Sequence, residues 1–158
     1  MSLPLPEMEP CYFCEIVAGR SEPWNVIARD ELTITLLNGR QFEAGQCMVV
    51  PLRHAPTLLE VSDGEAAAVM QAARRLAQVM LDVFGPDGVL LYQNNGTGSG
   101  QEVPHFHLHV VPRRTGSDWG LGPPHLAHLE TAPAPQFHHA AVTPQKRAVV
   151  AQLRDGYV

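Results

Sequence analysis

The stretch His105-Phe106-His107-Leu108-His109-Val110-Val111-Pro112 decides the fold class of this chain. Histidines alternate with large apolar residues, and this period of two predicts a half-buried β-strand that ends at the proline. Because successive side chains of a strand point to opposite faces, the three histidines share one face, with neighbouring imidazoles about 6.6 Å apart. Phe106, Leu108 and Val110 then point into a core on the other face.

Three imidazoles on one face indicate metal binding, acid–base catalysis or nucleophilic catalysis near neutral pH. Decoration of a solvated strand is the alternative. The preceding residues 94–101 read Asn-Asn-Gly-Thr-Gly-Ser-Gly-Gln. Gly96, Gly98 and Gly100 can adopt positive φ and let a ligand approach the backbone, where a nest of N–H groups favours phosphate. The sequence therefore predicts an anion-binding loop that leads into the row of imidazoles.

The flanking segments predict an α+β domain. Residues 24–29 and 32–37 form a predicted hairpin, residues 47–51 a buried strand, and residues 88–94 a strand that pairs with the histidine strand. Ser62 and Glu65 have the spacing of a capping box, and Gly85-Pro86 ends the helix that follows. The predicted buried face of this helix consists of Ala66, Val69, Met70, Ala73, Leu76, Ala77, Met80, Leu81 and Phe84.

The triad His-x-His-x-His, followed by two apolar residues and preceded by Gly-Gln-x-Val, resembles the signature of the histidine-triad (HIT) nucleotide hydrolases and transferases. The resemblance extends from Cys11 to Arg114. It implies a HIT-like fold, in which one long helix crosses a five-stranded antiparallel sheet, and commonly a homodimer. We therefore expect an N-terminal arm over residues 1–10, a HIT domain over 11–114, and an irregular C-terminal tail over 115–158 that packs on the domain or on the dimer partner.

By this resemblance, His107 is the nucleophile that attacks the α-phosphorus of a purine nucleotide and forms a nucleotidyl-histidine, which water hydrolyses. His109 would donate to a phosphate oxygen or to the leaving group. A glutamine at the third histidine would mark a transferase or phosphorylase branch, so His109 favours hydrolysis. The substrate would be a dinucleoside polyphosphate such as Ap3A or Ap4A, or a nucleoside phosphoramidate. The expected nucleotide contacts come from Phe13, Asn38, Asn94, Gly100, Gln101, Glu102 and Val103.

Several of these residues also have ordinary structural interpretations. Asn38 would bind the ribose hydroxyls, but Asn-Gly is also a common turn. Asn94 would meet a phosphate oxygen or cap the loop. Phe13, together with Ile34 and Leu36, would line a base pocket or belong to the core.

Glu102 departs from the family pattern, which places Ser or Thr there. A carboxylate repels phosphate unless it is protonated or turned away, although it could also protonate a leaving group. This residue keeps a second function open, namely a zinc-stabilised nucleotide-binding or scaffold module with little turnover.

Cys11-Tyr12-Phe13-Cys14 is a C-x-x-C motif that could be a redox pair, a metal site or two small hydrophobic residues. As a metal site it needs two further ligands, for which His54 and His105 are candidates. Similar bacterial HIT proteins bind zinc with such a set, which implies the ligands Cys11, Cys14, His54 and His105. Four protein ligands close the tetrahedron, so the zinc would be structural.

Composition excludes several classes. Of the 158 residues, 45% are hydrophobic and 17% are charged, as in one globular domain. A net charge of −5 argues against a nucleic-acid partner, which would require a basic surface. The sequence contains neither an apolar run of about 18 residues nor a basic region followed by an apolar stretch, so neither a membrane span nor a signal peptide is expected. Three cysteines do not form a secreted disulfide framework, so we expect a cytoplasmic protein.

The tail differs in composition from the rest. Four histidines, His125, His128, His138 and His139, lie among prolines, and we interpret them as surface residues rather than a second metal site. Thr143-Pro144 then predicts the start of a short helix whose apolar stripe includes Val149, Val150 and Leu153.

Overall fold

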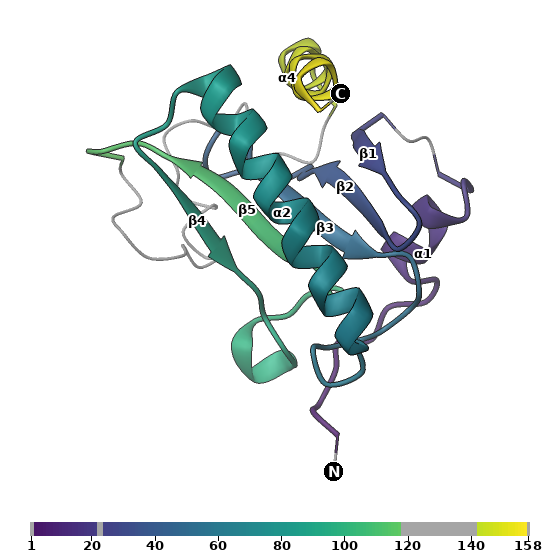
Figure 1. Cartoon of the computed structure of the whole chain (residues 1–158). Helices are drawn as coiled ribbons and strands as arrows, with labels where there is room; N and C mark the ends of the chain where they lie inside the picture. The colour runs from purple at the N-terminus through teal and green to yellow at the C-terminus, as the bar shows by residue number, and fades with distance from the viewer. Residues whose placement is uncertain (1, 22–23, 118–141, 158) are drawn as a thin grey trace.

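The computed structural model describes residues 2–21, 24–117 and 142–157. Five strands form one antiparallel sheet in the order β1-β2-β3-β5-β4, and the long helix α2 crosses one face of it (Figure 1). The elements are α1 (Tyr12–Val17), β1 (Val26–Arg29), β2 (Thr33–Leu37), β3 (Cys47–Pro51), α2 (Asp63–Phe84), β4 (Gly88–Tyr92), the 3₁₀ turn η1 (Thr97–Ser99), β5 (Leu108–Arg113) and α4 (Pro144–Gly156). This confirms the predicted α+β layout. None of the described helices is both long and apolar enough to cross a bilayer.

The predicted capping box of α2 is confirmed. The Ser62 hydroxyl accepts from the Glu65 N–H (3.3 Å), while a Glu65 carboxylate oxygen accepts from the Ser62 N–H (2.9 Å). The helix ends at Gly85 in the left-handed conformation, with φ of 54°. Two residues of the predicted buried face were wrong, because Met70 is 53% and Leu81 is 44% exposed.

The physical reason for this error is helical geometry. The row that faces the sheet runs through Val69, Ala72, Ala73, Leu76, Val79 and Met80, all of which are buried. Each further residue rotates by about 100° around the axis, so Met70 and Leu81 lie one step outside this row.

The sheet has an apolar cluster on each face. The larger cluster joins α2 and α4 to side chains such as Leu37, Val49 and Val110. The smaller cluster joins Phe13 and Ile16 of α1 to Ile34, Leu36, Met48 and Val50. Met48 pairs directly with His109, so the triad histidines lie on the α1 side of the sheet.

The histidine strand begins later than predicted. Its pairing with β3 stops at Val49–Leu108, and β5 starts at Leu108 rather than at His105. The N–H of Phe106 instead donates to the carbonyl of Ala55 (2.6 Å). The alternation of side chains nevertheless continues, since Phe106, Leu108 and Val110 belong to the α2-side core as predicted.

Both terminal segments contact the body of the domain. In the N-terminal arm, the Pro4 carbonyl accepts from the N–H of Thr97 in the glycine loop (2.9 Å). The tail is not irregular throughout, since the helix predicted from Thr143 is confirmed as α4, with Val150 and Leu153 buried. Helix α4 packs on α2 and β1 (Figure 1). The four tail histidines lie outside the described residues.

Candidate functional site

His107 is buried at the centre of the site, in the extended segment before β5. Its Nδ1 lies 2.7 Å from the carbonyl oxygen of His105. A carbonyl only accepts, so Nδ1 carries the proton and Nε2 keeps its lone pair. Burial lowers the pKa of His107, which favours the neutral imidazole. The ring packs against Phe13 of α1 at a centroid separation of 5.1 Å.

His109 follows on β5 as the next ring on the same face, 4.9 Å from His107 between centroids. It stacks on the ring of Tyr92 in β4, at 4.3 Å and an interplanar angle of 12°. Its Nδ1 lies 3.3 Å from Nε2 of Gln46, the residue before β3. Burial, followed by the charge of His107, holds the pKa of His109 well below its usual range. Sequence reasoning missed both Gln46 and Tyr92, because their approach to His109 depends on strand register.

The glycine loop does not present the predicted row of free N–H groups. Gly96 and Gly100 have φ of 78°, whereas Gly98 is not among the glycines with positive φ. The N–H groups of Gly96, Thr97, Ser99, Gly100 and Gln101 already have partners within the protein. The loop geometry is therefore built from internal hydrogen bonds, and these five donors do not form the expected anion nest.

The side chains of Gln101 and Asn94 hold this loop together. The Gln101 amide oxygen accepts from the Gly96 N–H (2.6 Å), and its nitrogen donates to the carbonyls of Pro56 (2.7 Å) and Val103 (2.8 Å). Asn94 donates to the Gly100 carbonyl (3.3 Å) and thus caps the loop, which is one of the two roles expected for it. Both residues support the segment that leads into the triad.

The remaining predicted nucleotide contacts come from several elements of the fold. Asn38 follows β2 and accepts from the N–H of Arg40 (3.2 Å), as in an Asn-Gly turn. Glu102 is exposed and points toward Arg40, with 3.9 Å between the charged atoms. Val103 packs at the edge of the α1-side cluster, and Phe13 belongs to it. Ile34 and Leu36 are ordinary core residues of the same cluster.

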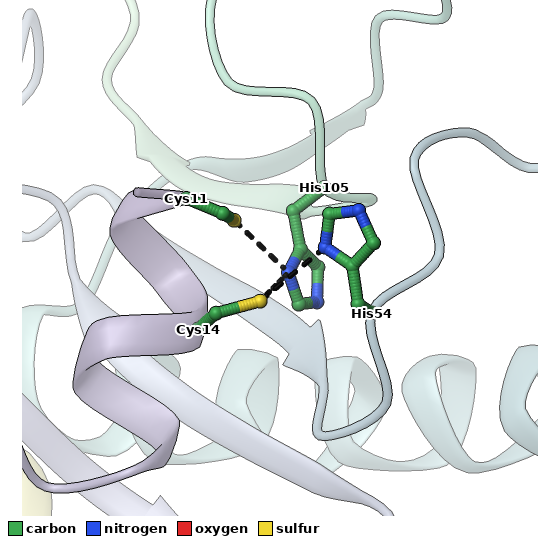
Figure 2. A group of neighbouring side chains, drawn as sticks. All are labelled: Cys11, Cys14, His54 and His105. Atoms are coloured by element: carbon green, nitrogen blue, oxygen red, sulfur yellow. Dashed lines mark hydrogen bonds between the residues drawn. The ribbon is translucent and has the colours of Figure 1, made fainter. Parts of the chain in front are cut away.

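Four side chains converge beside the triad as one group of possible metal ligands. One ligand atom from each of Cys11, Cys14, His54 and His105 lies within 4.8 Å of all the others (Figure 2). Cys11 and Cys14 come from the start of α1, three residues apart and thus on one side of its first turn. His54 comes from the loop after β3, and His105 from the segment before β5. Two of the three cysteine–histidine contacts span more than 90 residues of sequence.

The geometry of this group fits a tetrahedral zinc ion. The sulfur-to-nitrogen distances are 3.5 Å for Cys11–His105, 3.3 Å for Cys14–His54 and 3.6 Å for Cys14–His105. Zinc with ordinary Zn–S and Zn–N bonds places these atoms about 3.6 Å apart. Nε2 of His105 donates to the Pro51 carbonyl (2.9 Å), so its Nδ1 offers a lone pair to the cysteines.

Ionisation of the thiols would couple to metal binding. When only protein groups surround Cys14, burial and the Cys11 thiol raise the pKa of Cys14 to about 11. Burial lowers the pKa of His105 to about 4, so this ring is neutral, as a ligand must be. A divalent cation would deprotonate the coordinating thiols.

Comparisons with known proteins agree with this architecture. The family model described as HIT domain matches residues 20–116. "Protein hit" of Bacillus subtilis is 33% identical over 122 residues, covering 77% of this chain and 83% of its own. "Adenosine 5'-monophosphoramidase hnt1" of Schizosaccharomyces pombe is 30% identical over 112 residues, covering 71% and 80%. The crystal structure of a Zn-bound histidine triad family protein from Mycobacterium smegmatis superposes with a TM-score of 0.75 at 27% identity, covering 94% of this chain and 93% of that one.

The matched residues include the glycine loop, the triad segment and all five strands. The relatives align over most of their own length as well as most of this chain. On this evidence the chain belongs to the HIT domain family, with a HIT fold and a Cys-Cys-His-His group that resembles those of zinc-bound members.

Proposed function

We propose that this protein hydrolyses a nucleotide conjugate at its α-phosphate through a nucleotidyl intermediate on His107. One observation carries the proposal, namely the hydrogen bond from His107 Nδ1–H to the His105 carbonyl. It leaves Nε2 as a neutral nucleophile in a ring that is held by Phe13 and His109. A buried nucleophile with a fixed tautomer is what a covalent displacement at phosphorus requires.

In the first step, the Nε2 lone pair of His107 bonds to the α-phosphorus as the bond from phosphorus to the leaving group breaks. His109, the adjacent ring, donates a hydrogen bond to the leaving group, which takes its proton from water. The modified His107 ring is cationic, and the His105 carbonyl stabilises its Nδ1–H. In the second step, water bonds to phosphorus, the P–N bond breaks, and the nucleoside monophosphate leaves with His107 restored.

We propose a purine nucleotide as substrate, either a dinucleoside polyphosphate such as Ap3A or Ap4A or a nucleoside phosphoramidate. The relative named as a monophosphoramidase supports the second class. Phe13, Asn38, Glu102 and Val103 are proposed nucleotide contacts, and Phe13 packs against the His107 ring. Asn94, Gly100 and Gln101 complete this set, and their internal hydrogen bonds indicate that they act by shaping the loop.

We propose that the Cys-Cys-His-His group holds a structural zinc ion. Its fit rests on the sulfur-to-nitrogen distances and on the Nδ1 lone pair that His105 directs toward the cysteines. Bound zinc would cross-link α1 to the loop after β3 and to the segment that carries His107. It would have no open position for substrate, so the residues of the triad do the chemistry.

We also propose a homodimer. The resemblance to the family supports it, and β4 is an edge strand of the sheet, with Leu91 41% exposed. An edge strand offers unpaired backbone groups that a second copy can satisfy. Light scattering coupled to size exclusion would then give twice the chain mass of 17.3 kDa.

The function is tested with wild type and His107→Ala on Ap3A, Ap4A and an AMP phosphoramidate. We expect wild type to release AMP and the variant to lose activity on the order of 10⁴-fold. Hydrolysis in ¹⁸O-water should label the AMP, and a substrate chiral at phosphorus should react with retention, because two displacements occur. Inversion, or full activity of His107→Ala, would refute the covalent histidine.

The second candidate, a binding module with little turnover, is favoured by the exposed carboxylate of Glu102, which stands where the family pattern has Ser or Thr. It predicts that wild type binds AMP but cleaves none of the substrates. Glu102→Ser, which restores the hydroxyl expected at this position, should then produce measurable turnover. If the wild type is active, this candidate is excluded.

A further inference from the structure

The amide of Gln46 has a fixed orientation. The side chain is buried, with 1% exposure. Its oxygen accepts from the backbone N–H of Phe42 (3.2 Å). A backbone N–H can only donate, so the atom that faces Phe42 must be the oxygen, and the NH₂ group must face the other way. The NH₂ group lies 3.3 Å from Nδ1 of His109 and 3.2 Å from the hydroxyl oxygen of Tyr92.

An NH₂ group cannot accept a hydrogen bond, so Nδ1 of His109 must accept here. Nδ1 therefore carries a lone pair, and the proton of the neutral ring lies on Nε2. The stacked ring of Tyr92 holds the plane of the imidazole while this contact is made. Burial, which lowers the pKa of His109, agrees with a ring that carries one proton rather than two.

The two catalytic rings then have opposite tautomers. His107 donates from Nδ1 to the His105 carbonyl and keeps a lone pair on Nε2. His109 accepts at Nδ1 from Gln46 and keeps a proton on Nε2. His107 is thus prepared to attack phosphorus with its Nε2 lone pair, and His109 is prepared to donate from its Nε2–H. The opposite tautomer of His109 would direct a lone pair at an anionic phosphate and have no proton to give.

We propose that Gln46 is a positioning residue that holds His109 as its Nε2–H tautomer and thereby makes it a hydrogen-bond donor to the leaving group. This role rests on the proposed function, because it assigns Gln46 to the same reaction. Nε2–H donates a hydrogen bond to the leaving oxygen or nitrogen as its bond to phosphorus breaks, and the leaving atom takes its proton from water. The water that attacks in the second step bonds to phosphorus and releases its proton to solvent, so His109 keeps the proton on Nε2 throughout.

The tautomer is tested without substrate, by long-range ¹H–¹⁵N correlation spectra of the histidine rings. In wild type, His109 should show an unprotonated Nδ1 and a protonated Nε2. Gln46→Glu replaces the NH₂ donor by an acceptor, so Nδ1 should become protonated, as in a carboxylate–histidine pair. A protonated Nδ1 in wild type, or an unchanged spectrum in Gln46→Glu, would overturn the proposal.

The consequence for catalysis is tested with two leaving groups, measured above neutral pH. The alkylamine of an adenosine 5′-(N-alkyl phosphoramidate) is a poor leaving group that needs a hydrogen-bond donor at its nitrogen, whereas an adenosine 5′-(p-nitrophenyl phosphate) releases a stable phenolate. For Gln46→Glu we expect kcat on the phosphoramidate to fall about 10²-fold. On the p-nitrophenyl ester, kcat should change less than about threefold, because that leaving group departs without help from a donor.

Gln46→Met is the matched control, since it removes the amide without adding an acceptor. Free imidazole itself favours the Nε2–H form, so this variant should lose less than about tenfold on the phosphoramidate. Equal losses on both leaving groups, or equal losses in both variants, would assign Gln46 a merely structural role and overturn the proposal. If wild type cleaves neither substrate, the proposed function fails, while the spectra still decide the tautomer.

Discussion

Replacing Leu153 by alanine tests whether the C-terminal helix is part of the folded core. Leu153 has no solvent exposure and belongs to the α2-side cluster. Helix α4 also approaches α2 closely, since a Cβ at Gly156 would lie 2.9 Å from Val79. Truncating a fully buried leucine loses its transfer free energy and leaves a cavity, so we expect the free energy of unfolding to fall by about 3 kcal/mol.

Chemical denaturation followed by circular dichroism measures this change, with all variants at one protein concentration. For a chain of this size, the loss corresponds to a decrease in Tm of about 6–12 °C. The matched control is Gln152→Ala, the exposed neighbour on the same helix, which should change stability by less than about 0.5 kcal/mol. If Leu153→Ala is as stable as this control, α4 is not docked on α2 and the reasoning fails.

Three further predictions concern separate parts of the structure. Hydrogen bonds from Arg53 and the Ser62 backbone lower the pKa of Glu65 from 4.5 to about 2. The stabilisation that the ionised Glu65 carboxylate provides is therefore complete above pH 4.5 and is lost as the pH falls toward 2. Glu65→Gln should flatten the stability profile over that interval and cost about 1 kcal/mol at pH 7, measured by urea titration at each pH. Gly45 has φ of 92°, and a Cβ there would lie 2.7 Å from the Phe84 ring, so Gly45→Ala should destabilise by about 2 kcal/mol in the same assay. Elemental analysis should find one zinc per chain in wild type and much less in Cys14→Ser, and a chelator should lower the Tm of wild type but not of the variant.

Local features of this fold could be predicted because they depend on residues near one another in sequence. The period of two in the triad segment determines that Phe106 and Leu108 point away from His107, even though the ladder itself starts only at Leu108. The capping box of α2 and its glycine end are contacts within one helical turn. The start of α4 at Thr143 is equally local.

The full set of four metal ligands was predicted from the resemblance to a family rather than from a pattern in the sequence. The C-x-x-C motif is local, but it does not by itself select its partners. His54 lies 40 residues and His105 lies 91 residues from Cys14, and no periodicity connects them. The structure brings the four residues together because the loop after β3 and the segment before β5 both meet the start of α1.

The sequence by itself determined which side chains of the triad segment share a face, where α2 begins and ends, and which histidines stand in a row. Only the tertiary structure decided how the polar groups are paired. Gln46 meets His109, Gln101 closes the glycine loop, and Pro4 accepts from that loop across more than 90 residues. The physical reason is that a hydrogen bond needs its two atoms placed to within a few tenths of an ångström. Strand register and loop closure supply that precision, and neither can be derived from the order of residues in one segment.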